Sequence, residues 1–113
     1  MNYFAKISGI KSDEIKTATE DIIEKVCLHG YEDVDAGNLS GGNKRKLTLA
    51  MALIGRPKII FVDEASAGVD PVARRSLWKA IKSEGSQSAV IVTTHTMEEA
   101  EELSTKLGIM VEG

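Results

Sequence analysis

IIFVDE, at residues 59–64, is a run of four apolar side chains that ends in two acids. The run is short and β-branched, and every position in it is apolar. That pattern is typical of a strand in a parallel sheet with helices on both faces. AVIVTTH, at residues 89–95, repeats the pattern, and a third apolar run lies at residues 107–111. The order predicts a parallel β-α-β-α-β unit with crossover helices.

Helices are expected after each of the first two strands. Asp70-Pro71 has the pattern of an N-cap followed by proline at the first helical position, and it predicts a helix that runs to about Glu84. Thr96 and Glu99 have the spacing of a capping box, which predicts a helix after the second strand.

The first half of the chain contains no clear strand pattern and predicts helices. Ser12 is expected to cap one helix, and Ser40 is expected to open another that ends near Gly55. We therefore expect a helical subdomain at residues 1–55, followed by an α/β unit at residues 56–113.

Composition limits the classes of function. The chain has 113 residues and a net charge of −3 without a dense basic run, so a nucleic-acid partner is not expected. Cys27 is the only cysteine, which excludes an internal disulfide, and we expect it to be a small buried side chain. No apolar run reaches the roughly 20 residues that span a bilayer, and the N-terminus lacks a signal-peptide pattern.

Polar residues follow both predicted strands. Asp63 and Glu64 end the first strand, and His95 ends the second. Ligands bind outside the carboxyl ends of strands in open α/β sheets, so these side chains predict a site for Mg²⁺ and an attacking water. Each also has a simpler interpretation: the acids could cap a helix, and His95 could be a loop residue.

A glycine-rich helix start forms a second candidate site. Ser40, Gly41, Gly42 and Asn43 open the second helix, although two glycines weaken its first turn. Exposed amides at a helix N-terminus bind phosphate, and glycine allows close approach. The alternative is a flexible N-cap without a ligand.

Four segments now carry a family resemblance. LSGGN resembles the signature motif of ABC-transporter nucleotide-binding domains, IIFVDEA their Walker B strand, SAGVDP their D-loop and TTH their switch-histidine loop. The order and spacing also agree, which makes the set far more specific than any one motif. Longer strings such as SAGVDPVARRSLW and TTHTMEEAEEL resemble the A subfamily of eukaryotic ABC transporters, which handles lipids.

The resemblance implies ATP hydrolysis that powers transmembrane transport, with lipid as the expected cargo. Glu64 would be the general base, Asp63 would hold Mg²⁺ through water, and His95 would contact the γ-phosphate of ATP. Asp70 would lie in the D-loop at a dimer interface.

The signature residues would act on ATP held by another domain. Ser40, Gly41, Gly42 and Asn43 would contact ATP on a second nucleotide-binding domain. The other expected partners are the transmembrane domains of a transporter, which would place the chain at the cytoplasmic face of a membrane.

Two departures from the family pattern stand out. Ala65 replaces the usual proline after the catalytic acid, and no Gly-Lys dipeptide of a P-loop occurs in the chain. We therefore expect a partial P-loop NTPase fold without the P-loop strand, and we expect that this chain alone does not hydrolyse ATP. Apolar strand surface that the absent parts would cover should be exposed. The alternatives are a non-catalytic regulatory fragment and the truncated product of a pseudogene or gene model.

Overall fold

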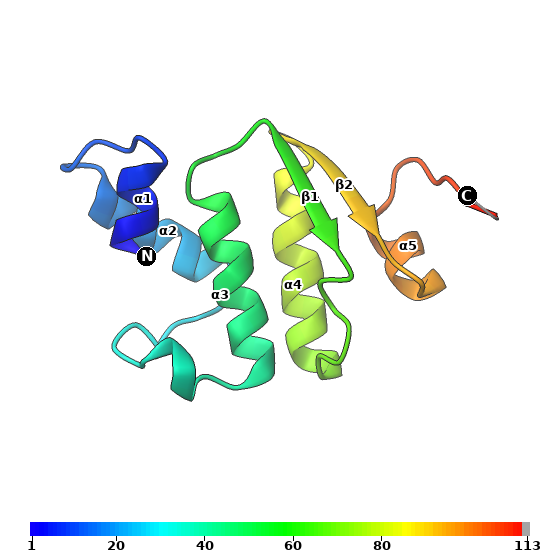
Figure 1. The fold of residues 1–113 in the computed structure, drawn as a ribbon, viewed down its shortest axis with the longest axis horizontal. Coiled ribbons are helices and arrows are strands. Elements are labelled where there is room, and N and C mark those ends of the chain that lie inside the picture. The colour runs from blue at the N-terminus through cyan, green and yellow to red at the C-terminus, as the bar shows by residue number, and fades with distance from the viewer. Residues whose placement is uncertain (112–113) are drawn as a thin grey trace.

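The computed structural model describes residues 1–111. The helices and strands of this part are α1 (Asn2–Ile7), α2 (Ile15–Lys25), the short 3₁₀ helix η1 (Ala36–Asn38), α3 (Gly41–Leu53), β1 (Ile59–Asp63), α4 (Pro71–Glu84), β2 (Ala89–Thr93) and α5 (Met97–Leu103). Figure 1 shows α3 and α4 side by side, with the two strands beside α4 and α5 beyond the end of β2. The fold is thus mixed α/β, as the sequence predicted.

The sheet is a parallel pair of β1 and β2 joined through α4. Ile60 lies opposite Val90, and Asp63 lies opposite Thr93. This register ends both strands at the same edge, so the residues that follow them leave the sheet close together.

The predicted third strand is absent from the described part of the chain. Residues 107–111 are irregular and exposed, although they are apolar. A strand is stable only when a neighbour pairs with its backbone, and the sheet within residues 1–111 consists of β1 and β2 alone. The apolar pattern therefore predicted a strand where no pairing partner is present.

The two strands are buried on one face instead of both. Ile60 and Val62 point into the core, whereas Phe61 is 77% exposed and Ile91 is 50% exposed on the opposite face. Burial of both faces was thus a wrong prediction for this pair, while the expected exposure of apolar strand surface is confirmed. The exposed face is a potential aggregation surface.

Helix starts follow the sequence signals in part. Ser40 caps α3 and Asp70 caps α4, both with side-chain hydrogen bonds to the first turn. Ser12 does not cap α2, whose N-cap is Glu14. Thr96 is the N-cap of α5 but makes no capping hydrogen bond, because its hydroxyl contacts that of Thr94.

One hydrophobic core joins the helical half to the sheet. Its members include Val26 after α2, Leu53 of α3, Ile60 of β1 and Leu77 of α4. Cys27 is not part of it: the chain turns at this residue with a φ of 54°, and the side chain is exposed, contrary to expectation.

Polar contacts reinforce this core. Lys25 of α2 pairs with the buried Glu84 at the end of α4, and the buried Lys46 of α3 donates to the carbonyl of Cys27 over 3.3 Å. None of the helices in residues 1–111 is long and apolar enough to cross a membrane.

The exposed sheet face can be tested by substitution. We expect the double variant Phe61→Thr, Ile91→Thr to reduce concentration-dependent light scattering of the chain without lowering its unfolding midpoint, because both side chains already lie in water. Ile60→Thr is the matched control on the buried face, and it should lower stability by about 2–3 kcal/mol. Equal destabilisation by the two changes would contradict the one-sided sheet.

Candidate functional site

The carboxyl edge of the sheet brings three of the predicted residues together. Asp63 is the last residue of β1, and its carboxylate accepts a hydrogen bond from the hydroxyl of Thr93, its register partner on β2. Both side chains are exposed. The Asp63 carboxylate is thus fixed at the sheet edge and open to solvent.

Glu64 leaves the strand with an unusual backbone conformation. Its φ is 44°, in the left-handed region that non-glycine residues seldom adopt. Its N–H donates to the carbonyl of Thr93 over 3.0 Å, which extends the ladder by one bond. The turn directs its carboxylate toward β2, where Oε1 lies 3.0 Å from Nδ1 of His95.

The contact between Glu64 and His95 constrains the imidazole proton. An ionised carboxylate only accepts, so Nδ1 of His95 must carry a hydrogen for this bond to form. A neutral imidazole of that tautomer presents Nε2 as an acceptor and cannot donate to phosphate. To donate there, His95 must either be protonated or release Glu64. The side chain of Glu64 is 51% exposed and that of His95 is 68% exposed, so solvent screens the contact and the two groups can separate at little cost.

The loop that carries His95 is ordered by its neighbours. The N–H of Thr96 donates to the hydroxyl of Thr94 over 3.1 Å, which closes a small turn around His95. The turn fixes the backbone of His95, and the contact with Glu64 orients its ring.

The start of α3 forms a second group of candidate residues. The hydroxyl of Ser40 accepts from the N–H of Asn43 over 3.2 Å, as expected of an N-cap. Amides in the first turn of a helix have no partner within the helix, so those of Gly41 and Gly42 remain available for an anion.

The two glycines of this motif have different surroundings. A Cβ on Gly41 would meet nothing within 4 Å, so this side of the motif is open. A Cβ on Gly42 would lie 3.0 Å from Cβ of Ala73 and 3.3 Å from Oδ2 of Asp70. Gly42 therefore allows α3 to pack closely against α4, which the sequence did not indicate. A side chain there would need Ala73 and Asp70 to shift by a few tenths of an ångström.

Asp70 caps α4 beside the glycine motif. Its Oδ1 accepts from the N–H groups of Val72 and Ala73, over 3.0 and 3.1 Å. The bond from Ala73 is the main cause of a pKa below the usual range for this carboxyl, and the charge of Lys46 adds to the effect. The predicted N-cap is thus confirmed, and the place of Asp70 in a D-loop at a dimer interface stays a prediction.

The predicted residues thus fall into two groups. Asp63, Glu64 and His95 lie at the sheet edge, and Ser40 with its glycines lies at the start of α3. Residues 65–69 connect the sheet edge to Asp70, with turn bonds from Ala67 to Glu64 and from Val69 to Ser66. No hydrogen bond or ion pair within residues 1–111 joins the two groups directly.

The sequence analysis did not identify the contacts of two residues, Thr93 and Glu99. Thr93 was read only as part of a strand, yet its hydroxyl holds Asp63. Glu99 was read as half of a capping box, yet it is 2% exposed and accepts from Nε1 of Trp78 over 2.9 Å. The register of β1 and β2 would have revealed Thr93, but no local signal indicates the partner of Glu99.

Comparisons with known proteins identify the family of the chain. The family described as "AAA domain, putative AbiEii toxin, Type IV TA system" matches residues 4–101. The chain is 44% identical over 113 residues to ABC transporter A family member 12 of Arabidopsis thaliana, covering 98% of this chain and 12% of that protein. It is 45% identical to member 11 of the same plant, covering 100% of this chain and again 12% of that protein.

The fold and the matched profile define an AAA-type ATPase domain. The chain belongs to this family, and within it to the ATPase domains of the ABC transporter A subfamily. It spans about 12% of the length of the curated relatives that it matches.

The two glycines provide a matched pair of substitutions. Gly41→Ala should leave stability unchanged or raise it by about 0.5 kcal/mol, because alanine restricts the unfolded chain and meets open space. Gly42→Ala should be the less stable of the two variants by about 1 kcal/mol, since its Cβ would crowd Ala73 and Asp70. Denaturant unfolding of both variants measures the difference, and equal effects would contradict the close packing.

The cap of α4 should make stability depend on acid pH. Because the pKa of Asp70 is lowered on folding, its ionised form stabilises the fold above its unfolded value of about 3.8, and this contribution is lost as the pH falls through the lowered folded value. Asp70→Asn keeps an acceptor, so it should remain folded at neutral pH and lose this acid dependence. Asp70→Ala should lower the melting temperature at neutral pH as well. Identical melting curves between pH 2 and 5 for the wild type and Asp70→Asn would contradict the cap.

Proposed function

We propose that this chain supplies the catalytic acid, the switch histidine and the signature motif of an ABC-type ATPase. The observation that carries the proposal is the placement of Glu64 between Asp63 and His95 at the carboxyl edge of a parallel sheet. Hydrolysis of a phosphoanhydride needs an acid that accepts a proton from water, and a strand end of this kind is where such a group meets nucleotide.

Glu64 is assigned the proton transfer. Water attacks the γ-phosphorus, its proton passes to the Glu64 carboxylate, and ADP departs with the electrons of the broken bond. The left-handed turn at Glu64 supports this role, because it places the carboxylate beside His95 at the carboxyl edge of the sheet. His95 would leave Glu64 and donate to a γ-phosphate oxygen, so the pair at 3.0 Å is the arrangement before phosphate arrives.

Asp63 fits a water-mediated contact to Mg²⁺. This ion takes one or two carboxylates and keeps several waters, and the exposed Asp63 carboxylate offers one such ligand. When bound, Mg²⁺ would neutralise charge on the phosphates. Thr93 would keep the Asp63 carboxylate in one orientation while the ion exchanges.

The start of α3 is assigned to a second nucleotide. The open amides of Gly41 and Gly42, with the hydroxyl of Ser40, would contact the γ-phosphate of ATP held by another nucleotide-binding domain. Asp70 and the loop before it would lie at that interface. The sheet-edge residues and the glycine motif would therefore both be affected when the second domain binds.

The whole protein would be a membrane transporter. The relatives are transporters by name, which supports transmembrane domains as further partners. The family resemblance of the motifs implies the cytoplasmic face of a membrane as the location and lipid as the cargo. Within the domain, residues 1–55 would form the helical signature subdomain, and residues 56–113 would form part of the α/β core. The phosphate-binding loop would come from another segment.

Glu64→Gln in the complete parent domain tests the proposal. The change keeps the shape of the side chain and removes the charge that accepts a proton, so turnover should fall at least about a hundredfold, the lower range for a general base. ATP binding should survive. Phosphate release and equilibrium binding of a fluorescent ATP analogue measure the two effects.

Glu20→Gln is the matched control, because Glu20 is exposed on α2 far from the sheet edge in sequence and fold. It should leave turnover unchanged. If Glu64→Gln released phosphate at the same rate as this control, the assignment of Glu64 as the general base would be contradicted.

A further inference from the structure

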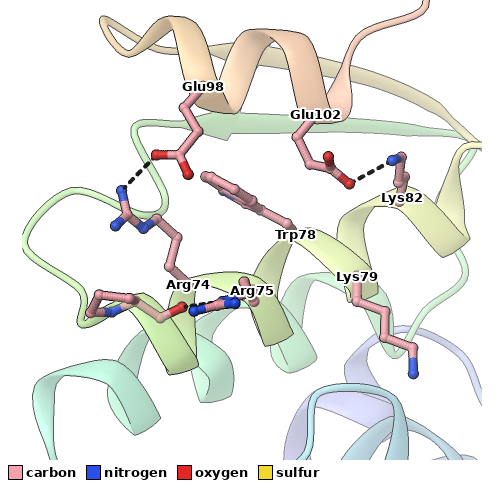
Figure 2. A pocket seen from close by; sticks show the side chains of 8 residues that line it. Arg74, Arg75, Trp78, Lys79, Lys82, Glu98 and Glu102 are labelled. Atoms are coloured by element: carbon pink, nitrogen blue, oxygen red, sulfur yellow. Dashed lines mark hydrogen bonds and ion pairs between the residues drawn. The ribbon is translucent and has the colours of Figure 1, made fainter.

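Helix α5 begins two residues after His95, so its placement determines where this histidine lies. It packs against α4, and Figure 2 shows side chains of the two helices that face each other. The contacts between these helices therefore bear on the position of His95 at the sheet edge.

Local forces do not hold α5 in place. It has seven residues, which is too short for a helix that is stable by itself in water. Its sequence MEEAEEL places like charges one turn apart at Glu98 and Glu102, and Thr96 makes no side-chain hydrogen bond to its first turn. The position of α5 must therefore come from contacts with the rest of the fold.

The one buried residue among residues 97–103 is an acid. The carboxylate of this residue, Glu99, accepts a hydrogen bond from Nε1 of Trp78 on α4 over 2.9 Å, and both residues are buried. Apolar packing has no preferred direction, whereas a hydrogen bond weakens steeply when its angle changes. The bond between Glu99 and Trp78 therefore fixes how α5 is turned about its axis.

Two ion pairs flank this contact and add less to it. Arg74 pairs with Glu98 over 3.5 Å. Lys82 pairs with Glu102 over 2.6 Å, and Figure 2 shows the two pairs on either side of Trp78. Both acids are exposed, so solvent screens these pairs. The buried bond to Trp78 is thus the contact between the helices that solvent weakens least.

The buried bond lies close to His95 along the chain. Glu99 follows His95 by four residues, which is about one helical turn. A fixed Glu99 therefore constrains the start of α5, and the turn formed by Thr94 and Thr96 passes this constraint to the histidine backbone. The contact of His95 with Glu64 is exposed and screened, so it cannot hold the loop alone.

We propose that Trp78 and Glu99 are positioning residues for His95, and that their buried hydrogen bond keeps the imidazole within reach of Glu64 and of the γ-phosphate. The inference rests on the proposed function, since it gives these residues a part in the same hydrolysis. Neither side chain contacts nucleotide, and both act through the placement of α5. Without the bond, α5 stays on α4 but loses its fixed rotation, and His95 faces the phosphate less often.

The test replaces the contact by apolar groups in the complete parent domain. Trp78→Phe with Glu99→Leu removes both polar partners, so no buried polar group is left unsatisfied and the domain should stay folded. We expect kcat for phosphate release to fall about tenfold or more, since a small misplacement of a reacting group costs up to about a hundredfold. KM for ATP should be unchanged, because the contact is not part of the nucleotide site.

A measurement without nucleotide separates positioning from a loss of stability. The NMR signals of the His95 ring in the nucleotide-free domain should shift in the double variant toward those of Glu64→Ala, in which the contact with Glu64 is absent. Trp78→Phe alone removes only the indole donor, and it should shift the same signals in the same direction. This single variant gives the answer if the double variant does not fold.

Two further variants are matched controls. Glu99→Gln keeps an oxygen that accepts from the indole N–H, so it should retain both turnover and the His95 signals. Lys82→Gln removes an exposed ion pair between the same two helices, and it should also leave both unchanged.

Unchanged kcat and unchanged His95 signals in the folded double variant, or unchanged signals in Trp78→Phe, would overturn the inference. An equal loss of turnover in Lys82→Gln would do so as well, because any loosening of α5 would then have the same effect. The proposed function fails separately, if Glu64→Gln hydrolyses ATP at the wild-type rate. Full turnover by the double variant, beside a loss of turnover in Glu64→Gln, removes the positioning role alone.

Discussion

The parallel pairing of β1 and β2, with Asp63 opposite Thr93, is the constraint on which the other features depend. It ends both strands at one edge, so Glu64 and His95 leave the sheet as neighbours although they are far apart in sequence. It also requires α4 to cross between the strands, because parallel neighbours cannot be joined by a tight turn. The crossing helix then begins with the Asp70 cap.

Contact between the starts of α3 and α4 connects the sheet edge to the glycine motif. Gly42 lies so close to Ala73 and Asp70 that a Cβ there would be 3.0 Å from Cβ of Ala73 and 3.3 Å from Oδ2 of Asp70. This packing holds the start of α3 against the start of α4.

Sequence predicted the parts of the fold that local chemistry determines. The caps at Ser40 and Asp70 and the two strands were found correctly, because each depends on a few neighbouring residues. Tertiary contacts decided the rest. The segment 107–111 has strand composition but no pairing partner within residues 1–111, and Glu99 has capping spacing but binds Trp78. Among the site residues, the proximity of Glu64 to His95 was foreseen, whereas the left-handed turn at Glu64 was not.

The central claim is that Glu64 acts on the nucleotide of its own domain and Ser40 on that of the partner. Mixed pairs of the complete domain test it by ATP hydrolysis. Glu64→Gln in one copy and Ser40→Arg in the other damage the same composite site, so the second site should keep measurable turnover. When one copy carries both changes and its partner is unchanged, both composite sites are damaged, and ATP turnover should be abolished. Equal turnover of the two arrangements would contradict the account.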